Sequence, residues 1–301
     1  MAARLCSTLP DAKPSLYCLR QNLRRQICLR PNTVIACPPS WTTNAKAAIA
    51  TGAVGIAQLL CPAPAAADYK VWTPDVNLHV LELENVGDVS SDPGSAKNGA
   101  QSYTFEAEYG LTGWWQSELE LEFNRAPGPG QSTRFDQITW ENLFQFTERG
   151  EYWIDAGFFA EYGQARQKGN PNETTFGPVL RKDFFGTSNS INLFLEKDLG
   201  PNAASRPVFL FAWETRIDAW VMRMGRHFEV EPGVQIYGQP GAVGQFPRWN
   251  LQDERAGPQL FGKIHNLGPG TLEWNGGVLF GLTSAVPRTT VRWQAEYEIH
   301  F

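Results

Sequence analysis

Apolar and polar residues alternate one by one over most of the chain from residue 76 onward. The pattern is clearest at the end, where one set of alternate residues is apolar or aromatic: Val291, Trp293, Ala295, Tyr297, Ile299 and Phe301. Most of the residues between them are charged or polar. Because successive side chains of a β-strand point to opposite faces, this period of two predicts a strand with one apolar face.

The same pattern recurs along the chain, which has 28 Gly and 21 Pro to form turns. The alternation on both sides of the turn at 110–113 is typical of a β-hairpin. We expect about twelve strands, at residues 76–84, 102–109, 115–123, 138–146, 152–162, 174–182, 189–197, 209–221, 228–236, 257–264, 272–282 and 289–301.

The expected connections alternate between short turns and longer polar loops, with 284–288 as one short exception on the loop side. Outer-membrane barrels of bacteria have an even number of antiparallel strands, short periplasmic turns and longer external loops. A soluble β-sandwich, the alternative, has no reason for this alternation. The sequence therefore predicts an all-β fold for residues 68–301: a closed, antiparallel, up-and-down transmembrane β-barrel.

In a membrane barrel the apolar strand faces meet lipid and the polar faces line the lumen. The polar faces here are acidic, and the field of such a lumen favours cations. The pattern predicts a porin-like channel for passive or facilitated passage of small solutes. The lumen-lining candidates are Glu106, Glu108, Glu118, Glu120, Glu122, Glu141, Asp155, Glu214, Arg216, Asp218, Glu229, Glu231, Arg292, Glu296 and Glu298.

A second interpretation of the same polar faces is a structural barrel whose lumen is filled by Arg–Glu networks and water. Twelve strands lie between the filled eight-stranded barrels and the open sixteen-stranded porins. Strand number therefore leaves an open lumen and a filled lumen as alternatives.

The first 67 residues have the composition of a targeting region. Lys46 is followed by an apolar run and then by Ala65-Ala66-Ala67, so residues 41–67 predict a secretory signal peptide that is cleaved after Ala67. Residues 1–40 are basic, and we interpret them as the product of a mis-assigned start codon; a long targeting region is the alternative. All five cysteines lie within the first 61 residues.

Charge limits the partners of the mature chain. Residues 1–67 carry seven Lys or Arg and one acid, so the net charge of −5 for the whole chain becomes −11 for residues 68–301. An acidic protein is not suited to nucleic acid.

The sequence has no motif for catalysis, a cofactor or a metal. The four histidines lack the H-E-x-x-H arrangement, and G-x-S-x-G is absent. The alternative from another functional class is a lipid or peptide hydrolase of the outer leaflet, for which only His79, beside Glu82 and Glu84, is expected near an external loop.

Two stretches resemble known proteins. The terminal Phe301 on an alternating strand, with Trp293, Tyr297 and Ile299, resembles the assembly signal of Gram-negative outer-membrane β-barrels. The hairpin Glu106-Ala107-Glu108-Tyr109-Gly110-Leu111-Thr112-Gly113-Trp114-Trp115 resembles that of transport barrels related to phenol-degradation-pathway proteins (the MetA-pathway group), with Gly113 in place of their acidic residue. The resemblance implies an outer-membrane location, with membrane lipid, the barrel-assembly machinery and a small-molecule solute as partners.

Overall fold

The computed structural model describes residues 69–301 and, before them, the backbone of three short strands. These strands are β1 (Tyr17–Gln21), β2 (Arg25–Arg30) and β3 (Thr33–Cys37), which form an antiparallel sheet in the order β1-β2-β3. They belong to one compact unit, Met1–Ala65, and the rest of the chain forms a second unit, Ala66–Phe301. The expected signal peptide at 41–67, its cleavage site and most of residues 1–40 lie outside the described residues.

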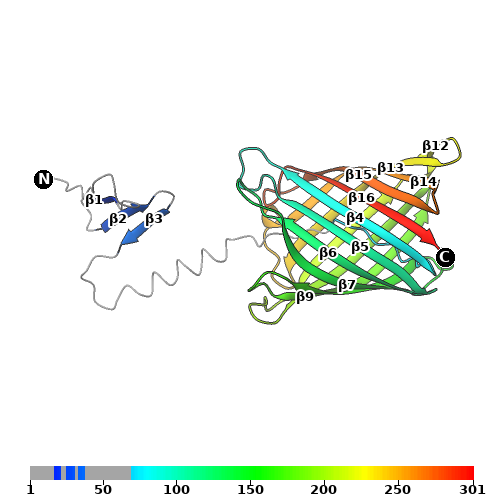
Figure 1. Cartoon of the computed structure of the whole chain (residues 1–301), viewed down its shortest axis with the longest axis horizontal. Helices are drawn as coiled ribbons and strands as arrows, with labels where there is room; N and C mark the ends of the chain where they lie inside the picture. Colours follow the sequence, from blue (N-terminus) through cyan, green and yellow to red (C-terminus); the bar gives the residue numbers. More distant parts are fainter. Residues whose placement is uncertain (1–16, 22–24, 31–32, 38–68) are drawn as a thin grey trace. The chain divides into compact units, whose positions relative to one another are not determined.

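The second unit is a closed antiparallel barrel of twelve strands (Figure 1). Its strands are β4 (Val80–Ser91), β5 (Gln101–Thr112), β6 (Trp115–Arg125), β7 (Arg134–Gln145), β8 (Asp155–Ala165), β9 (Asn172–Phe184), β10 (Thr187–Leu199), β11 (Val208–Arg216), β13 (Phe228–Ala242), β14 (Asp253–Leu267), β15 (Gly270–Gly281) and β16 (Thr289–His300). Each strand pairs with its neighbour in sequence, and β16 pairs with β4 to close the ring. The fold class predicted from alternation is therefore confirmed.

The closing pair begins later than the alternation indicates. β4 starts at Val80 rather than at residue 76, and it continues to Ser91 through a stretch expected to be a loop. The pattern was misleading because Asn85 faces outward, where its side-chain oxygen accepts a hydrogen bond of 3.1 Å from the indole of Trp293, while Val86 faces inward and is buried. In the resulting register His300 lies opposite Val80, and Phe301 follows the strand and is exposed.

The two ends of the barrel differ in their connections. At the end that we call the turn end, residues 113–114, 185–186 and 268–269 join strands directly. The same end has two longer connections, 146–154 and 217–227, because β8 starts at Asp155 and β11 stops at Arg216. The second of these contains a short 3-10 helix, η1 (Asp218–Trp220), and a short strand, β12 (Met222–Met224), that pairs with β13.

At the opposite end, which we call the loop end, every connection is a loop: 92–100, 126–133, 166–171, 200–207, 243–252 and 282–288. The 243–252 loop contains a second 3-10 helix, η2 (Trp249–Leu251). The expected contrast between turns and loops therefore holds for three of the turn-end connections and fails at 146–154 and 217–227.

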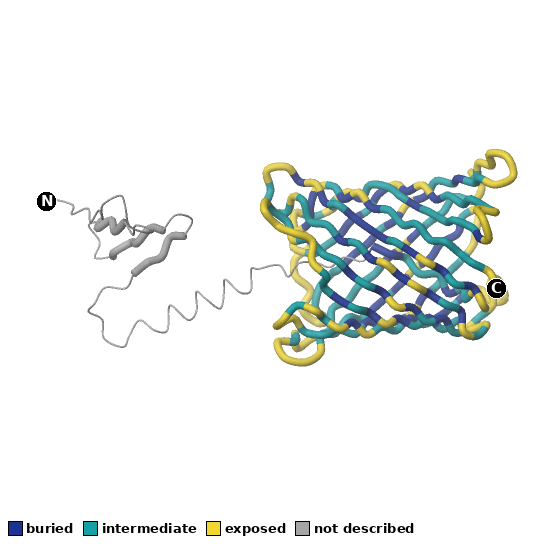
Figure 2. Tube along the Cα trace, in the orientation of Figure 1, coloured by how far each residue is buried: buried dark blue, intermediate teal, exposed yellow. Residues whose placement is uncertain are grey.

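The outer surface of the barrel is apolar, and its interior is mostly polar. Along each strand buried and less buried residues alternate, which Figure 2 shows as dark blue against teal and yellow. On β5 and β6, for example, Phe105 and Leu119 are 54% and 52% exposed, while the adjacent Glu106 and Glu118 are buried. A soluble protein has the reverse arrangement, with apolar residues inside and polar residues outside. An apolar outer face suits a surface that faces lipid, and in a closed barrel all backbone groups of the sheet can be paired. No helix in residues 69–301 is long and apolar enough to cross a bilayer.

A charge on this outer surface tests its environment. We expect Leu119→Arg, near the middle of β6, to lower the free energy of unfolding in lipid vesicles by about 2–4 kcal/mol, the cost of Arg at a bilayer midplane. The measurement is a urea titration in which the folded fraction is read from heat-modifiable migration on SDS gels. The control is Ser132→Arg in the exposed 126–133 loop, which we expect to change stability by less than about 0.5 kcal/mol. Equal stability of the two variants would contradict a lipid-facing surface.

Candidate functional site

The chain before β4 runs through the interior of the barrel. This part, Tyr69–His79, which we call the lumen segment, bonds to inward-facing side chains of strands that are far apart in the barrel order, among them β5, β10 and β13. Bonds to such distant strands require the segment to lie inside the ring. It leaves the barrel at the turn end, where the backbone N–H of His79 donates to the carbonyl of Gly110 over 3.0 Å.

Side chains of the wall hold the backbone of the lumen segment. The side chain of Asn192, which is fully buried, accepts from the N–H of Trp72 and donates to its carbonyl, both over 2.9 Å. Gln145 accepts from the N–H of Val76 over 2.8 Å. Buried backbone groups need such partners, and here the wall supplies them as a neighbouring strand would.

Two further contacts fix the segment near its ends. The hydroxyl of Tyr237 on β13 donates to the carbonyl of Tyr69 over 2.8 Å. Arg181 on β9 lies 2.6 Å from the carboxylate of Asp75. Together with the bonds to Trp72 and Val76, these contacts spread over the length of the segment.

Two inward-facing glycines give the segment room. A Cβ atom on Gly110 would collide with the backbone carbonyl of Asn77, and one on Gly157 would press on Pro74 and on the carbonyl of Phe144. Any larger residue at these positions would push the segment away from the wall. The wall is therefore shaped for the chain that lies against it.

Glutamates form two continuous rows across neighbouring strands. The strand register places members of the first row directly opposite one another, in the order Glu298, Glu82, Glu108, Glu118, Glu141 and Glu161 from β16 to β8. The second row runs from β15 to β6 through Glu273, Glu296, Glu84, Glu106 and Glu120. We call these the glutamate rows. Like charges directly opposite each other are destabilising, so nearby cations would stabilise the glutamate rows.

Lys70 of the lumen segment supplies one cation. Its Nζ lies 2.5 Å from a carboxylate oxygen of Glu106, 2.8 Å from Glu84 and 3.2 Å from Glu118. All four side chains are buried. Charge-assisted hydrogen bonds to three carboxylates satisfy the three donors of an ammonium group.

Trp72 lies two residues further on and fills an apolar pocket. Its ring centroid is 4.5 Å from that of Phe159 on β8 and 5.6 Å from that of Phe194 on β10. Leu143 and Val179 complete the buried cluster. These four wall residues face inward, where the alternation predicted only polar side chains.

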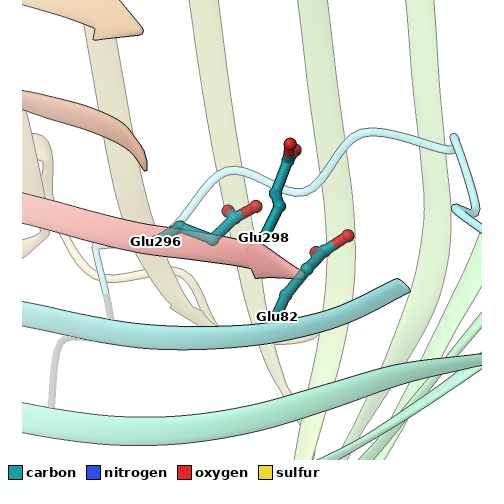
Figure 3. Close-up of side chains that lie close together, drawn as sticks. All are labelled: Glu82, Glu296 and Glu298. Carbon is teal, nitrogen blue, oxygen red and sulfur yellow. The ribbon is translucent and has the colours of Figure 1, made fainter. Parts of the chain in front are cut away.

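Three other carboxylates meet near the turn end. Oxygens of Glu82, Glu296 and Glu298 lie within 4.8 Å of one another, and Figure 3 shows the three side chains on the same side of the β4–β16 pair. The side-chain amide of Asn77 donates to Glu82 over 3.0 Å. Oxygen ligands of this kind suit a hard cation such as Ca²⁺. Oxygens of Glu84, Glu106 and Glu118 also lie within 4.8 Å of one another, and these three residues bind Lys70.

Basic residues and amides occupy the interior between β13 and β16. Arg292, 1% exposed, donates to Gln235 over 2.8 Å and also to Asn275. Arg255 lies 2.8 Å from Asp253, with its guanidinium 4.9 Å from the ring centroid of Tyr69. This side of the interior is therefore less acidic than the side formed by β4–β8.

The structure places most of the predicted lumen residues inside the barrel. The buried ones are Glu106, Glu108, Glu118, Glu120, Glu122, Glu141, Asp155, Glu214 and Arg292. The half-buried ones are Arg216, Glu229, Glu231, Glu296 and Glu298. Asp218 does not lie on a strand: it belongs to η1, is exposed, and accepts a hydrogen bond of 2.8 Å from Ser188. Glu229 lies near the turn end, 3.0 Å from Arg223 of β12. Asp218 and Glu229 therefore do not line the part of the wall near Lys70.

The sequence pattern does not identify the central residues of the site. Lys70, Trp72 and Asn192 are not identified because the alternation describes the strands of the wall and not a chain that lies inside it. A signal for the apolar pocket is visible in the sequence. Three pairs of adjacent large apolar residues break the alternation, so one member of each must face inward: Leu143-Phe144, Phe158-Phe159 and Leu193-Phe194.

The histidine of the hydrolase alternative, His79, lies at the turn end and not in one of the connections of the loop end. Its Nδ1 lies 3.2 Å from the hydroxyl of Tyr109, and its backbone lies against Gly110. Of the residues in the expected assembly signal, Trp293, Tyr297 and Ile299 lie on β16 and Phe301 follows it, and their role in assembly stays a prediction.

No family model matches the chain, and neither does any curated protein. Among solved structures, the barrel aligns with a NanC porin at 10% identity and a TM-score of 0.46, over 73% of this chain and 100% of that one. It aligns with the translocator domain of the autotransporter NalP from Neisseria meningitidis at 7% identity and a TM-score of 0.46, over 84% and 98%. A third is OccK9 from Pseudomonas aeruginosa, at 11% identity and a TM-score of 0.24, over 73% and 97%. The resemblance to the MetA-pathway group stays a prediction.

Removing the Lys70 ammonium tests its part in holding the structure together. We expect Lys70→Met to lower the free energy of unfolding by about 3 kcal/mol or more, because carboxylates are left buried without their counter-charge. Equilibrium unfolding in vesicles measures the change. Lys168→Met, at an exposed loop position, is the matched control, with an expected change below about 0.5 kcal/mol. If both substitutions cost the same, the buried ion pairs do not stabilise the lumen segment.

Proposed function

We propose that the chain is an outer-membrane channel that favours small cations and that its own lumen segment closes. The observation that carries the proposal is the Lys70 ammonium, which lies inside the barrel between Glu84, Glu106 and Glu118. A positive group is what this interior binds, and it is delivered by a segment that is not part of the wall.

The outer surface supports the membrane location. Large apolar side chains such as Phe105, Leu119 and Trp140 project outward from successive strands and are about half exposed. Soluble monomers rarely expose contiguous apolar patches of more than a few hundred Å². A bilayer covers such a surface at no cost to the backbone, whose hydrogen bonds are closed within the ring.

The glutamate rows support cation preference. A lumen lined by one sign of charge between low-dielectric walls concentrates counter-ions. The rows run across β15, β16 and β4–β8, so about half of the ring presents carboxylates inward. Anions meet this field as a barrier.

The lumen segment supports closure by the chain itself. The segment runs from Tyr69, which bonds to Tyr237 on β13, to His79 at the turn end, which bonds to Gly110. Hydrogen bonds therefore hold it at both ends. A closed structural barrel is the second candidate function, favoured by the same segment together with the Arg292 network. The two differ in whether release of the segment opens a path.

Planar-bilayer recordings decide between a gated channel and a closed barrel. We expect the wild-type chain to show small or rare conductance steps and Lys70→Gln/Trp72→Ala to show larger, longer steps, because both anchors of the segment are lost. Cation permeability of the variant is expected to exceed anion permeability by about tenfold, the low end of charge-steered enrichment.

The control for these recordings carries the same two kinds of substitution on exposed positions, Lys168→Gln/Trp249→Ala, and should behave as wild type. Gly110→Val provides an independent way to displace the segment, with Gly113→Val, where an added Cβ meets nothing within 4 Å, as its partner control. Closed behaviour of both displaced variants, with heat-modifiable migration intact, would reject the channel in favour of the structural barrel.

A further inference from the structure

Lys70 and Trp72 form one unit on the lumen segment. The Lys70 Nζ is 5.5 Å from the centroid of the Trp72 ring, so a positive charge and an aromatic ring lie side by side. The ammonium contacts β4, β5 and β6, and the ring contacts β8 and β10.

The wall beside this pair has acceptor capacity that the segment does not use. Glu141, 2% exposed, faces the same part of the interior, and its Oε2 has no hydrogen-bond partner among the described residues. A small cavity adjoins it, lined in part by Trp72, Glu118, Glu141 and Phe159. A buried acceptor that lacks a partner is costly, so the site is built for a donor beyond Lys70.

The pocket around the ring recognises an aromatic shape rather than an indole. The Trp72 Nε1 is buried and has no acceptor among the described residues, so the pocket makes no specific bond to the indole N–H. Phe159 packs on the ring at a tilt of 41° and Phe194 meets it edge-on at 64°. Such contacts accept any flat apolar ring of similar size.

From these observations we infer that the wall around Lys70 and Trp72 is a binding site for organic cations that join an ammonium group to an aromatic ring. The inference rests on the proposed function and names the solute class of the same channel. In the closed state the lumen segment occupies the site with its own ammonium and ring. When the segment leaves, the carboxylates take the ammonium of the solute, and Phe159 and Phe194 take its ring.

The site has two halves that an ordinary cation or an ordinary aromatic compound fills only in part. A small alkylammonium ion gains the carboxylates and leaves the aromatic pocket empty. An aromatic acid gains the pocket and brings a negative charge to the glutamate rows. Selectivity for the combined ligand follows from adding both contributions in one molecule.

Isothermal titration calorimetry in detergent micelles tests the inference without requiring conduction. The protein is the full chain with Lys70→Gln/Trp72→Ala, which vacates the site, and the probe is tryptamine. Ethylammonium lacks the ring and indole-3-acetate reverses the charge. We expect tryptamine to bind at least about tenfold more tightly than ethylammonium, and indole-3-acetate not to bind; tenfold corresponds to about 1.4 kcal/mol. Wild-type protein should bind tryptamine more weakly, because the segment competes.

Substitutions in the wall separate the two halves. In the same background, Phe159→Ala should reduce the affinity for tryptamine to that for ethylammonium, and Glu118→Gln should weaken both. Glu122→Gln, buried on the same strand as Glu118 but bonded to Asn124, is the matched control and should change neither. If the double variant does not migrate as a folded barrel, Trp72→Ala alone vacates the ring pocket and is used with the same probes.

The outcomes distinguish this inference from the proposed function. Equal binding of tryptamine and ethylammonium, or binding of indole-3-acetate, overturns the solute class, even if the displaced variants conduct cations. Preferential binding of tryptamine that Phe159→Ala abolishes supports it, even if no variant conducts. Conductance alone decides whether the chain is a channel.

Discussion

The structure depends on how a wall of opposed glutamates is compensated. In the glutamate rows, carboxylates face one another across strand after strand, and because most of them are buried their charges are only weakly screened by water. The Lys70 ammonium offsets part of this repulsion from inside the lumen, where its Nζ bonds to Glu84, Glu106 and Glu118. Because this cation belongs to the lumen segment, the negative charge of the wall is compensated only when the segment occupies the lumen.

This coupling explains the shape of the chain before β4. Lys70 bonds to Glu84, which lies only four residues along β4 from Val80, so the segment covers the distance between the glutamate rows and the turn end. The segment therefore reaches the glutamate rows from the turn end. Gly110 and Gly157 leave room for the segment, and Asn192 satisfies the backbone N–H and carbonyl of Trp72. The first strand starts only where the segment has left the interior, which is why β4 begins at Val80.

The wall was predictable from the sequence, and the segment inside it was not. Alternation located all twelve strands because each has one apolar outer face and one face inside, as in the hairpin that places Phe105 and Leu119 outside and Glu106 and Glu118 inside. The alternation failed at Asn85 and Val86, where a polar residue faces outward and an apolar residue faces inward. It also failed where η1 replaces the end of an expected strand.

The candidate site follows the same division. The glutamates could be assigned to the inner face one by one, but their alignment into rows depends on strand register, which the sequence pattern does not specify. Lys70 and Trp72 gave no local signal, because nothing in Tyr69–His79 distinguishes a chain within a lumen from the start of a strand. Only the adjacent apolar residues, such as Phe158-Phe159, show in the sequence that part of the inner face is apolar.

The interior is divided, and the division determines what it can bind. β4–β8 present carboxylates, whereas the buried cluster of Leu143, Phe159, Val179 and Phe194 lies on β7–β10. The two regions overlap at β7 and β8, where Glu141 is two residues from Leu143 and Glu161 is two residues from Phe159 on the same inward face. A charge alone would settle on the first region and a ring alone on the second. The lumen segment spans the junction with Lys70 on one side and Trp72 on the other, so it matches the wall in charge and in shape at once.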